Sequence, residues 1–334
     1  MRILLIGGTG NLSEECAAEL HGQGHVITVL TRGRREVPDQ FRCLHADYRD
    51  REALRIALGT GEYDVVLNFL GFDLADVESD IRMFQGRVGQ YLFISSATVY
   101  AKPVRVLPLT EDAPLGNPRW DYARRKLECE RRLQQAHAEL GFPVTIVRPS
   151  HTFGRRWIPN PVSSSSYTFA ARVEQGRPVF IPDDGSNPWT LTAASDFAAA
   201  LAGLAGLDRA VGEVFHITSD EAPPWSRIYA EIAGALGVAL PPVVPVPAGF
   251  ICEVAPSLTG TLLGDKVHPA VFDNAKIKRF VPGWNCRKSV REALGESVRW
   301  LRAHPGERAV DPELDGLIER VIGRWRAHES TPGP

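Results

Sequence analysis

The chain begins MRILLIGGTGNLS (residues 1–13), and this stretch decides the fold. Arg2 to Ile6 is a short apolar run typical of a buried strand, and apolar side chains recur at helical spacing after the glycines. A strand, a glycine turn and a helix in this order open a βαβ unit that binds a dinucleotide. Gly7 and Gly10 allow a tight turn and a close approach of the backbone to a pyrophosphate. The first N–H groups of the helix can then receive the charge of that anion.

Length and composition restrict the kind of protein further. The 334 residues, 44% of them hydrophobic, are enough for one large domain or two closely packed ones. A formal net charge of -2 with mixed signs favours a small-molecule substrate over nucleic acid or an anionic membrane. The five cysteines lie apart without metal-ligand spacing, so we expect reduced thiols and no metal site. Since we find neither a secretory leader nor a long apolar span, we expect a cytoplasmic protein.

Short apolar runs alternate with helical patterns along the first half of the chain. The runs are HVITVLT (25–31), FRCLHAD (41–47), YDVVLNFLGF (63–72), QYLFISSATVY (90–100) and FPVTIVRP (142–149). This alternation predicts an α/β fold of the Rossmann type, with a doubly wound parallel sheet. A helix and strand pattern returns at DFAAALAGLAGL (196–207) and GEVFHIT (212–218). We therefore expect an NAD(P)-binding domain over 1–150, joined by 190–220, and a smaller mixed substrate-binding lobe over 151–189 and 221–330.

The end of the second predicted strand bears on the choice of dinucleotide. NAD sites usually have an acidic residue here, which accepts hydrogen bonds from the adenosine ribose. This chain has Thr31 and Arg32 instead, and a hydroxyl and a guanidinium can bind a 2′-phosphate. The pattern favours NADP, with NAD as the alternative if the arginines only solvate a loop. Asp47 and Tyr48 are expected at the adenine edge, and Gly71 where a loop passes close to the cofactor.

A long predicted helix follows Pro118 and ends near Gly141. Its Tyr122 and Lys126 are four residues apart and therefore share one face. A tyrosine with an ordinary pKa of about 10 is too weakly ionised at neutral pH to take a proton from a hydroxyl. An ammonium one turn away is expected to lower that pKa, because it favours the phenolate.

Four segments together resemble the extended (atypical) short-chain dehydrogenases/reductases of the NAD-dependent epimerase/dehydratase family. They are GGTGNLS (7–13), FISSATVY (93–100), the Tyr122-x-x-x-Lys126 pair and RPSHTFG (148–154). The resemblance implies a catalytic set of Ser96, Tyr122 and Lys126, with Lys126 also reaching the nicotinamide ribose. The expected cofactor-binding residues are Gly7, Thr9, Gly10, Asn11, Leu12, Thr31, Arg32, Asp47, Tyr48, Leu70, Gly71, Tyr122, Lys126 and Pro149.

The chain departs from the family pattern where the substrate would bind. Ala97 and Thr98 stand where sugar 4,6-dehydratases have an Asp-Glu pair, which argues against that dehydration. His151 replaces the usual Asn of nucleotide-sugar enzymes, and Trp189 lies near the place of an Arg, so a nucleotide-diphosphate sugar is disfavoured. The alternatives are a hydrogen-bonded structural His151 and tryptophans that belong to the core. The expected substrate-binding residues are Ser96, Thr98, His151, Trp157 and Trp189.

These observations lead to one expected function and its rivals. We expect an NAD(P)-dependent epimerase or oxidoreductase that acts on a hydroxyl of a sugar-like or nucleoside-like molecule through a transient ketone, with Tyr122 as acid and base. One rival is a simple NADP-dependent dehydrogenase or reductase. The other is a non-catalytic NAD(P)-binding regulatory or RNA-binding protein, a role that some relatives of the family have. The helices near 76–85 and around Tyr122 are those through which a homodimer would form.

Overall fold

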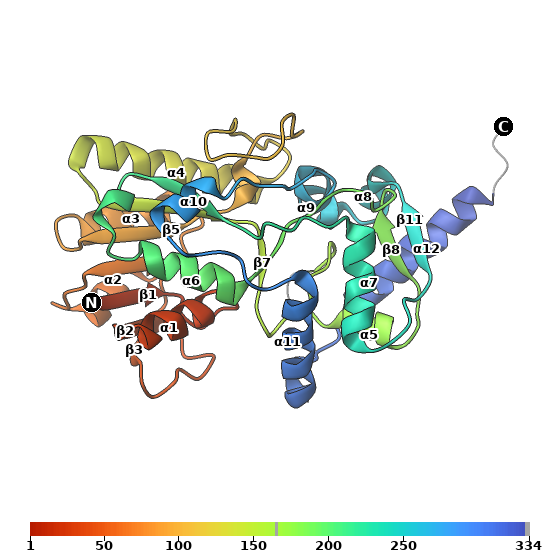
Figure 1. Ribbon diagram of the computed structural model, residues 1–334, viewed down its shortest axis with the longest axis horizontal. Coiled ribbons are helices and arrows are strands. Elements are labelled where there is room, and N and C mark those ends of the chain that lie inside the picture. Colours follow the sequence, from red (N-terminus) through yellow and green to blue (C-terminus); the bar gives the residue numbers. More distant parts are fainter. Residues whose placement is uncertain (164–165, 331–334) are drawn as a thin grey trace.

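The computed structural model describes residues 1–163 and 166–330, so residues 164 and 165 of the predicted substrate lobe lie outside it. The half of the molecule that contains the N-terminus is built on a sheet of seven parallel strands (Figure 1). In spatial order the strands are β10 (Val214–Ile217), β6 (Val144–Pro149), β5 (Gln90–Ile94), β4 (Val65–Asn68), β1 (Arg2–Ile6), β2 (Val26–Thr31) and β3 (Arg42–His45).

Side chains that alternate along the strands supply two separate cores, one on each face of the sheet. In β1, Ile3 and Leu5 belong to one core, and Leu4 and Ile6 to the other. The first core is covered by α1 (Ser13–Gly22) and α6 (Ala194–Leu204). The second is covered by α2 (Arg51–Leu58), α3 (Leu74–Phe84) and α4 (Asp121–Leu140). Helices on both faces of a parallel sheet confirm the predicted Rossmann-type α/β fold.

Two later segments of the chain pack back onto this sheet. The first is the predicted return, since α6 covers one face and β10 pairs with β6. The second is α10 (Ala275–Phe280), whose Ile277 belongs to the same core as α1. Sequence analysis assigns α10 to the substrate lobe, which is wrong for this segment. The reason is that Trp284 after α10 is buried beside α6, where its indole N–H donates to the carbonyl of Asp196 at 2.9 Å.

The remaining elements form the second half of the molecule, on the right of Figure 1. They enclose a third buried cluster, rich in aromatic side chains. Two short parallel pairs occur here: β7 (His151–Phe153) with β9 (Leu191–Ala193), and β8 (Val179–Pro182) with β11 (Val243–Val246). The helices are α5 (Thr168–Glu174), α7 (Trp225–Leu236), α8 (Ala248–Val254), α9 (Thr259–Thr261), α11 (Val290–Ala303) and α12 (Pro312–Glu329). A π-helix, η4 (Leu262–Lys266), and short 3-10 turns, η1 (Ala97–Val99), η2 (Asp208–Ala210), η3 (Pro256–Leu258) and η5 (Pro305–Glu307), complete the chain.

The parallel register brings the important turns to one edge of the sheet. Ile6 lies opposite Asn68, and Ile94 lies opposite Val147. The glycine turn, the loop after β4 and the serines after β5 therefore meet where ligands of such sheets bind. Among the helices in the described part of the chain, none has the length and apolar character needed to cross a membrane.

Candidate active site

The glycine turn after β1 has the geometry that a phosphate site requires. Gly7 has a φ of +88°, and a Cβ there would lie 2.6 Å from Cγ of Leu70. The Ser13 hydroxyl closes the turn, because it accepts from the N–H of Gly10 at 2.9 Å and donates to the carbonyl of Gly7. Leu12 at the N-cap of α1 supplies no side-chain cap. The residues therefore fit a dinucleotide pyrophosphate, since the helix end is open to an anion.

The first turn of α1 also contains an acidic side chain, which would repel a phosphate if it were unpaired. Glu14 forms ion pairs with Arg155 and with Arg156, whose Nε lies 3.0 Å from Oε2. A neighbouring contact ties the same turn to the strand pair of the second half, because Asn11 Oδ1 accepts from the N–H of Gly154 at 3.0 Å. Arg155 and Arg156 are thus held against α1 by the carboxylate of Glu14.

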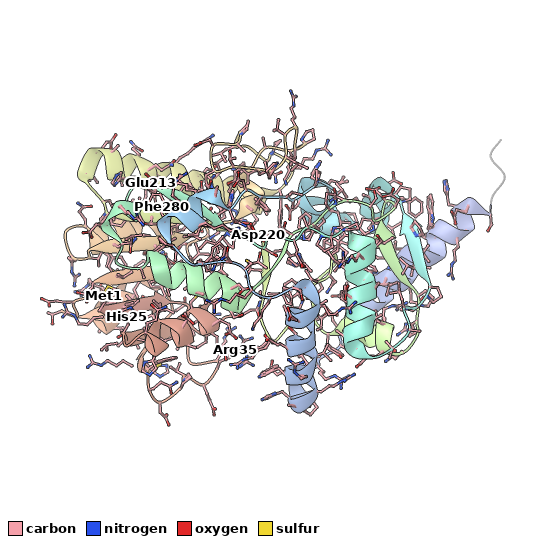
Figure 2. All side chains as sticks on the ribbon, viewed as in Figure 1. Met1, His25, Arg35, Glu213, Asp220 and Phe280 are labelled. Atoms are coloured by element: carbon pink, nitrogen blue, oxygen red, sulfur yellow. The ribbon has the colours of Figure 1, made fainter. Side chains whose placement is uncertain are left out.

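The predicted adenosine end contains both basic and acidic groups. Arg32 and Asp47 approach within 3.9 Å, with both side chains about half exposed. The hydroxyl of Thr31 accepts from the N–H of Gly33 at 3.3 Å. Arg35 lies on the side of the N-terminal half nearest α11 (Figure 2), and its guanidinium donates to the carbonyl of Thr9 at 2.8 Å. Thr31, Arg32 and Asp47 are thus brought to one place, and Arg35 joins the glycine turn.

Tyr48 does not lie where the sequence predicted. Its side chain is 3% exposed, and its hydroxyl donates to Asp80 at 2.7 Å beneath the sheet. Asn68 belongs to the same cluster, since its Nδ2 donates to Asp80 at 2.6 Å. Its Oδ1 accepts from the N–H groups of Leu70 and Gly71 at 2.7 and 2.9 Å. Tyr48 therefore supports the loop after β4 from within the core, and Asn68, an amide in an apolar run, is the shaping residue that sequence analysis missed.

Ser96 and Tyr122 both line a cavity of about 580 Å³ between the two halves of the molecule. The Ser96 hydroxyl accepts from the Thr98 hydroxyl at 3.0 Å. Burial raises the pKa of Tyr122 to about 12, the Ser96 hydroxyl opposes this shift, and the charge of Asp265 adds to it. The expected lowering of this pKa by Lys126 is therefore wrong, because the loss of hydration of the phenolate dominates.

The ammonium of Lys126 is bound to backbone carbonyls, although sequence analysis expects it to favour the ionised form of Tyr122. Its Nζ donates to the carbonyls of Gly71 and Ile94, both at 2.7 Å, and so joins the ends of β4 and β5. It also lies over the ring of Phe93, 4.8 Å from the ring centre. Burial lowers the pKa of Lys126 to about 8. The ammonium thus holds the loop after β4 next to the end of β5.

Ser95, next to Ser96, serves the framework of the site. Its hydroxyl donates to Oε1 of Glu130 in α4, and Glu130 also pairs with Arg148 of β6 at 2.7 Å. The side chains of Glu130 and Arg148 are 0% and 2% exposed. This buried contact fixes the end of β5 relative to α4, and therefore Ser96 relative to Tyr122.

The two departures from nucleotide-sugar enzymes meet at the opposite wall of the cavity. Nε1 of Trp189 donates to Nδ1 of His151 at 3.0 Å, and the rings of His151 and Trp157 are 4.9 Å apart. Burial and the charge of Lys266 lower the pKa of His151 well below its usual range. His151 is therefore neutral at pH 7, with Nδ1 as the acceptor. His151, Trp157, Trp189, Ser96 and Thr98 all line the cavity, and their contact with a substrate stays a prediction.

Three further charged residues line this cavity, and sequence analysis missed them. Lys102 follows the strand-end serines, and Asp265 and Lys266 come from η4. π-helical turns are rare and occur often at functional sites. The segment Gly260 to Lys266 has no sequence pattern that distinguishes it from an ordinary loop, so only the tertiary structure brings these charges together.

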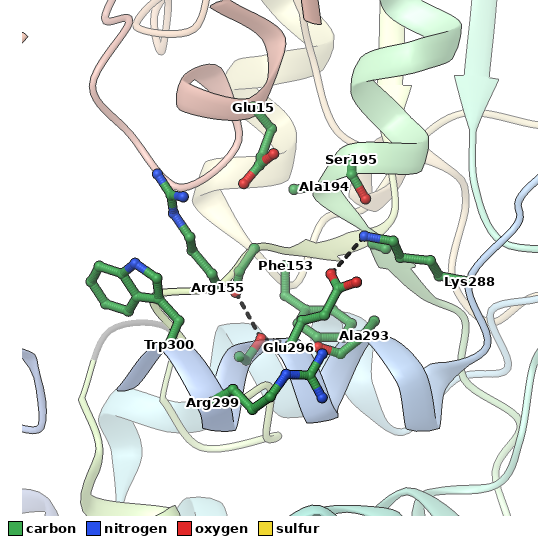
Figure 3. Close-up of a pocket in the computed structure, with 13 residues that line it drawn as sticks. Glu15, Phe153, Arg155, Ala194, Ser195, Lys288, Ala293, Glu296, Arg299 and Trp300 are labelled. Carbon is green, nitrogen blue, oxygen red and sulfur yellow. Dashed lines mark hydrogen bonds and ion pairs between the residues drawn. The ribbon is translucent and has the colours of Figure 1, made fainter. Parts of the chain in front are cut away.

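A second pocket, of about 430 Å³, lies between α1 and α11 (Figure 3). Lys288 and Glu296 form an ion pair across it at 2.6 Å, and the Ser297 hydroxyl donates to the carbonyl of Gly154 at 3.1 Å. Arg155 at its rim is already paired with Glu14. Ser96 and Tyr122 line the larger cavity and not this pocket, so the cavity beside Tyr122 is the better candidate for chemistry.

Comparison with known proteins agrees with this geometry. The model of the NAD dependent epimerase/dehydratase family matches residues 3–217. The chain belongs to the NAD-dependent epimerase/dehydratase family. Its relatives in this family include reductases and epimerases, and the chain is an NAD(P)-dependent epimerase or oxidoreductase of the short-chain dehydrogenase/reductase superfamily.

Two relatives and one solved structure illustrate the range of this epimerase/dehydratase family. The 2'-dehydrokanamycin reductase of Streptomyces kanamyceticus is 28% identical over 338 residues, which cover 100% of this chain and 93% of that protein. Chloroplast stem-loop binding protein of 41 kDa b from Arabidopsis thaliana is 28% identical over 258 residues, covering 73% and 65%. The UDP-glucose 4-epimerase from Bifidobacterium longum in complex with NAD+ and UDP shares the fold, with 19% identity, a TM-score of 0.75 and coverage of 92% and 100%.

Proposed function

We propose that the chain oxidises or reduces a carbon that bears a hydroxyl or keto group in a sugar-like or nucleoside-like molecule, with Tyr122 as the acid and base. The observation that carries this proposal is that Ser96 and Tyr122 open onto one cavity large enough for a small ring compound. Ser96 can donate a hydrogen bond to the reacting oxygen and so hold it near Tyr122.

The direction of proton transfer follows from the burial of Tyr122. With a pKa of about 12, Tyr122 is protonated at neutral pH and is a proton donor for the oxygen of a ketone. The dinucleotide, when bound, supplies or accepts the hydride. Lys126 keeps the ends of β4 and β5 in place beneath the reacting group. The arrangement supports reduction of a ketone, and an epimerase would use the same groups in both directions on two faces of one transient ketone.

We propose NADP as the preferred dinucleotide. Arg35 contacts the glycine turn, and β2 ends in Thr31 followed by Arg32, without an acidic residue. Asp47 beside Arg32 works against a 2′-phosphate, so the expected preference over NAD is moderate. Titration of the protein with NADPH and with NADH, followed by coenzyme fluorescence, measures this preference. Tighter binding of NADH than of NADPH would contradict this part of the proposal.

A nucleotide-diphosphate sugar is not the substrate that this cavity favours. His151 stands where the family pattern has an Asn, and Trp189 lies near the place of its Arg. The hydrogen bond between the two side chains offers a pyrophosphate no guanidinium. Trp157 and Trp189 instead line the cavity with apolar ring atoms, which suits a sugar-like ring. We expect no turnover of UDP-glucose by the purified protein, and steady epimerisation of it would contradict this reading.

Replacement of Tyr122 by Phe tests the mechanism. We expect Tyr122→Phe to lose at least about a hundredfold in kcat, because general acid catalysis contributes that much or more. The dinucleotide should still bind, since the hydroxyl is the only group removed. The activity assay uses a panel of sugar ketones and alcohols with both coenzymes, and Phe72→Leu, a ring neighbour of Tyr122, serves as the control. A fully active Tyr122→Phe enzyme would overturn the mechanism.

Release of the dinucleotide distinguishes the two kinds of reaction. Stoichiometric NAD or NADP in the supernatant of the denatured protein would support epimerisation, in which the cofactor stays bound. An empty protein that oxidises NADPH in the presence of a ketone would support a reductase. Because one relative is a stem-loop binding protein, an electrophoretic assay with structured RNA completes the test. A salt-sensitive shift together with an inactive Tyr122 site would favour the binding-protein alternative.

A further inference from the structure

Lys102 is a nearly buried ammonium on the wall of the catalytic cavity. Its side chain is 3% exposed, and the ion pair that it makes among the described residues, to Oδ1 of Asp265, spans 3.8 Å. That distance is longer than a hydrogen bond. An ammonium has three N–H donors, so the contact with one carboxylate oxygen of Asp265 leaves donors available to a ligand in the cavity. Burial lowers the pKa of Lys102.

The carboxylate nearest to Lys102 is already shared with a second cation. Oδ2 of Asp265 accepts from Nζ of Lys266 at 3.0 Å, and the side chains of both residues are largely buried. Nζ of Lys266 also lies over the ring of Trp189, 4.5 Å from its centre. Lys102 and Lys266 therefore share one carboxylate in the same wall, each at a different oxygen.

The charges that line the cavity do not balance. Two lysines face one aspartate, while the remaining titratable lining residues, Tyr122 and His151, are neutral at pH 7. The described lining thus has one excess positive charge. An unbalanced buried charge is unfavourable unless a ligand neutralises it. An amine on the substrate would increase the imbalance, and a neutral hydroxyl would leave it unchanged.

We infer that the substrate has a single anionic group, a carboxylate or a phosphate monoester, which binds between Lys102 and Lys266. This inference rests on the proposed function, because it takes the cavity beside Tyr122 as the substrate site. The anion adds acceptors for the N–H groups of Lys102, while Asp265 keeps its ion pair with Lys266. Because Lys102, Lys266 and Tyr122 line one cavity, the anion binds within the same small space as the reacting oxygen. The substrate class is therefore a sugar acid or a sugar phosphate.

Binding to the NADPH-loaded protein tests this inference by calorimetry. The probes are glucuronate and glucose 6-phosphate, with glucose and glucosamine as the neutral and cationic counterparts. We expect either anionic sugar to bind at least about tenfold tighter than glucose, the gain typical of a charge-assisted hydrogen bond. Glucuronate favoured over glucose 6-phosphate would identify a carboxylate site, and the reverse a phosphate site. If no anionic sugar binds better than glucose, the inference is overturned.

Variants test whether Lys102 causes the preference for an anionic sugar. We expect Lys102→Met to remove the preference for the anion, and Lys102→Arg to keep most of it. Lys288→Met, which removes a lysine from the second pocket, should leave it unchanged. Circular dichroism and the melting temperature establish that each variant folds. An unchanged preference in a folded Lys102→Met protein would contradict the inference.

The same measurements in the Tyr122→Phe background separate this inference from the proposed function. Anion-selective binding without catalysis supports both. An active Tyr122→Phe enzyme that still prefers anions would overturn the proposed mechanism alone, and loss of the preference with Tyr122-dependent catalysis intact would overturn the anion site alone.

Discussion

At the scale of single residues, the most informative groups are buried and titratable. Tyr122, Lys126 and Asp80 all have pKa values displaced by burial, in the direction that disfavours the charged form. Sequence spacing placed Tyr122 and Lys126 on one helix face. Only the structure reveals that Lys126 is bound to two carbonyls and that its charge does not lower the pKa of the phenol.

Asp80 leads to a prediction about stability and pH. Burial raises its pKa from 3.8 to about 6, against the hydrogen bonds that it accepts from Tyr91, Tyr48 and Asn68. Between pH 3.8 and about 6 the native state therefore holds a proton that the unfolded state has lost. The free energy of unfolding contributed by this group falls as pH rises through that window. Urea titrations at several pH values should show this slope in the wild type and its loss in Asp80→Asn; equal slopes would contradict the assignment.

At the scale of elements, the turn between β1 and α1 requires glycine at position 7 for two reasons, its backbone conformation and its close packing. Gly7 has a φ of +88°, and a Cβ there would meet Leu70 at 2.6 Å. We expect Gly7→Ala to lose about 1 kcal/mol or more of stability and to weaken dinucleotide binding. Gly22→Ala, at the other end of α1, is the matched control, because a Cβ there meets nothing within 4 Å. Thermal melts and NADPH titrations compare the two; tight NADPH binding by Gly7→Ala would argue against a phosphate site at this turn.

The contact between α4 and β6 gives a second prediction for elements. Glu130→Ala leaves Arg148 buried without its partner, so we expect a loss of about 3–5 kcal/mol in the free energy of unfolding. Glu128→Ala on the same helix removes a carboxylate that is 41% exposed, and should change stability by about 0.5 kcal/mol or less. Chemical denaturation of both variants measures the contrast. Similar small effects would mean that the buried pair contributes little.

At the scale of the whole molecule, the sheet is built from distant parts of the chain. We propose the division into a dinucleotide-binding domain and a substrate lobe, with the correction that α10 joins the former. β10 completes the sheet beside β6, while α6 and α10 cover one face. The candidate active-site cavity takes its lining from both halves, so a dinucleotide on the first half and a substrate on the second would meet there.

A truncated chain tests this organisation. We expect a fragment of residues 1–150 to lack stable tertiary structure, because it removes α6, α10 and β10 and exposes the apolar side chains that they cover. Its proton NMR spectrum should have poor dispersion, and it should bind a hydrophobic dye. A monomeric fragment with a cooperative melt would show that the first domain folds without these segments.

The sequence by itself determined the fold class and the glycine turn, because each depends on local periodicity or on spacing along one element. The choice of Ser96, Tyr122 and Lys126 as the catalytic set came from the family resemblance and stays a prediction. The family membership confirms the class of enzyme that these motifs indicated. The tertiary structure alone decided that Tyr48 turns into the core, that His151 and Trp189 bind each other, and that Lys102 meets Asp265 and Lys266. These contacts join residues far apart in the chain. Whether the charges of Lys102, Asp265 and Lys266 balance depends on which side chains the fold buries together, and no local sequence pattern predicts that.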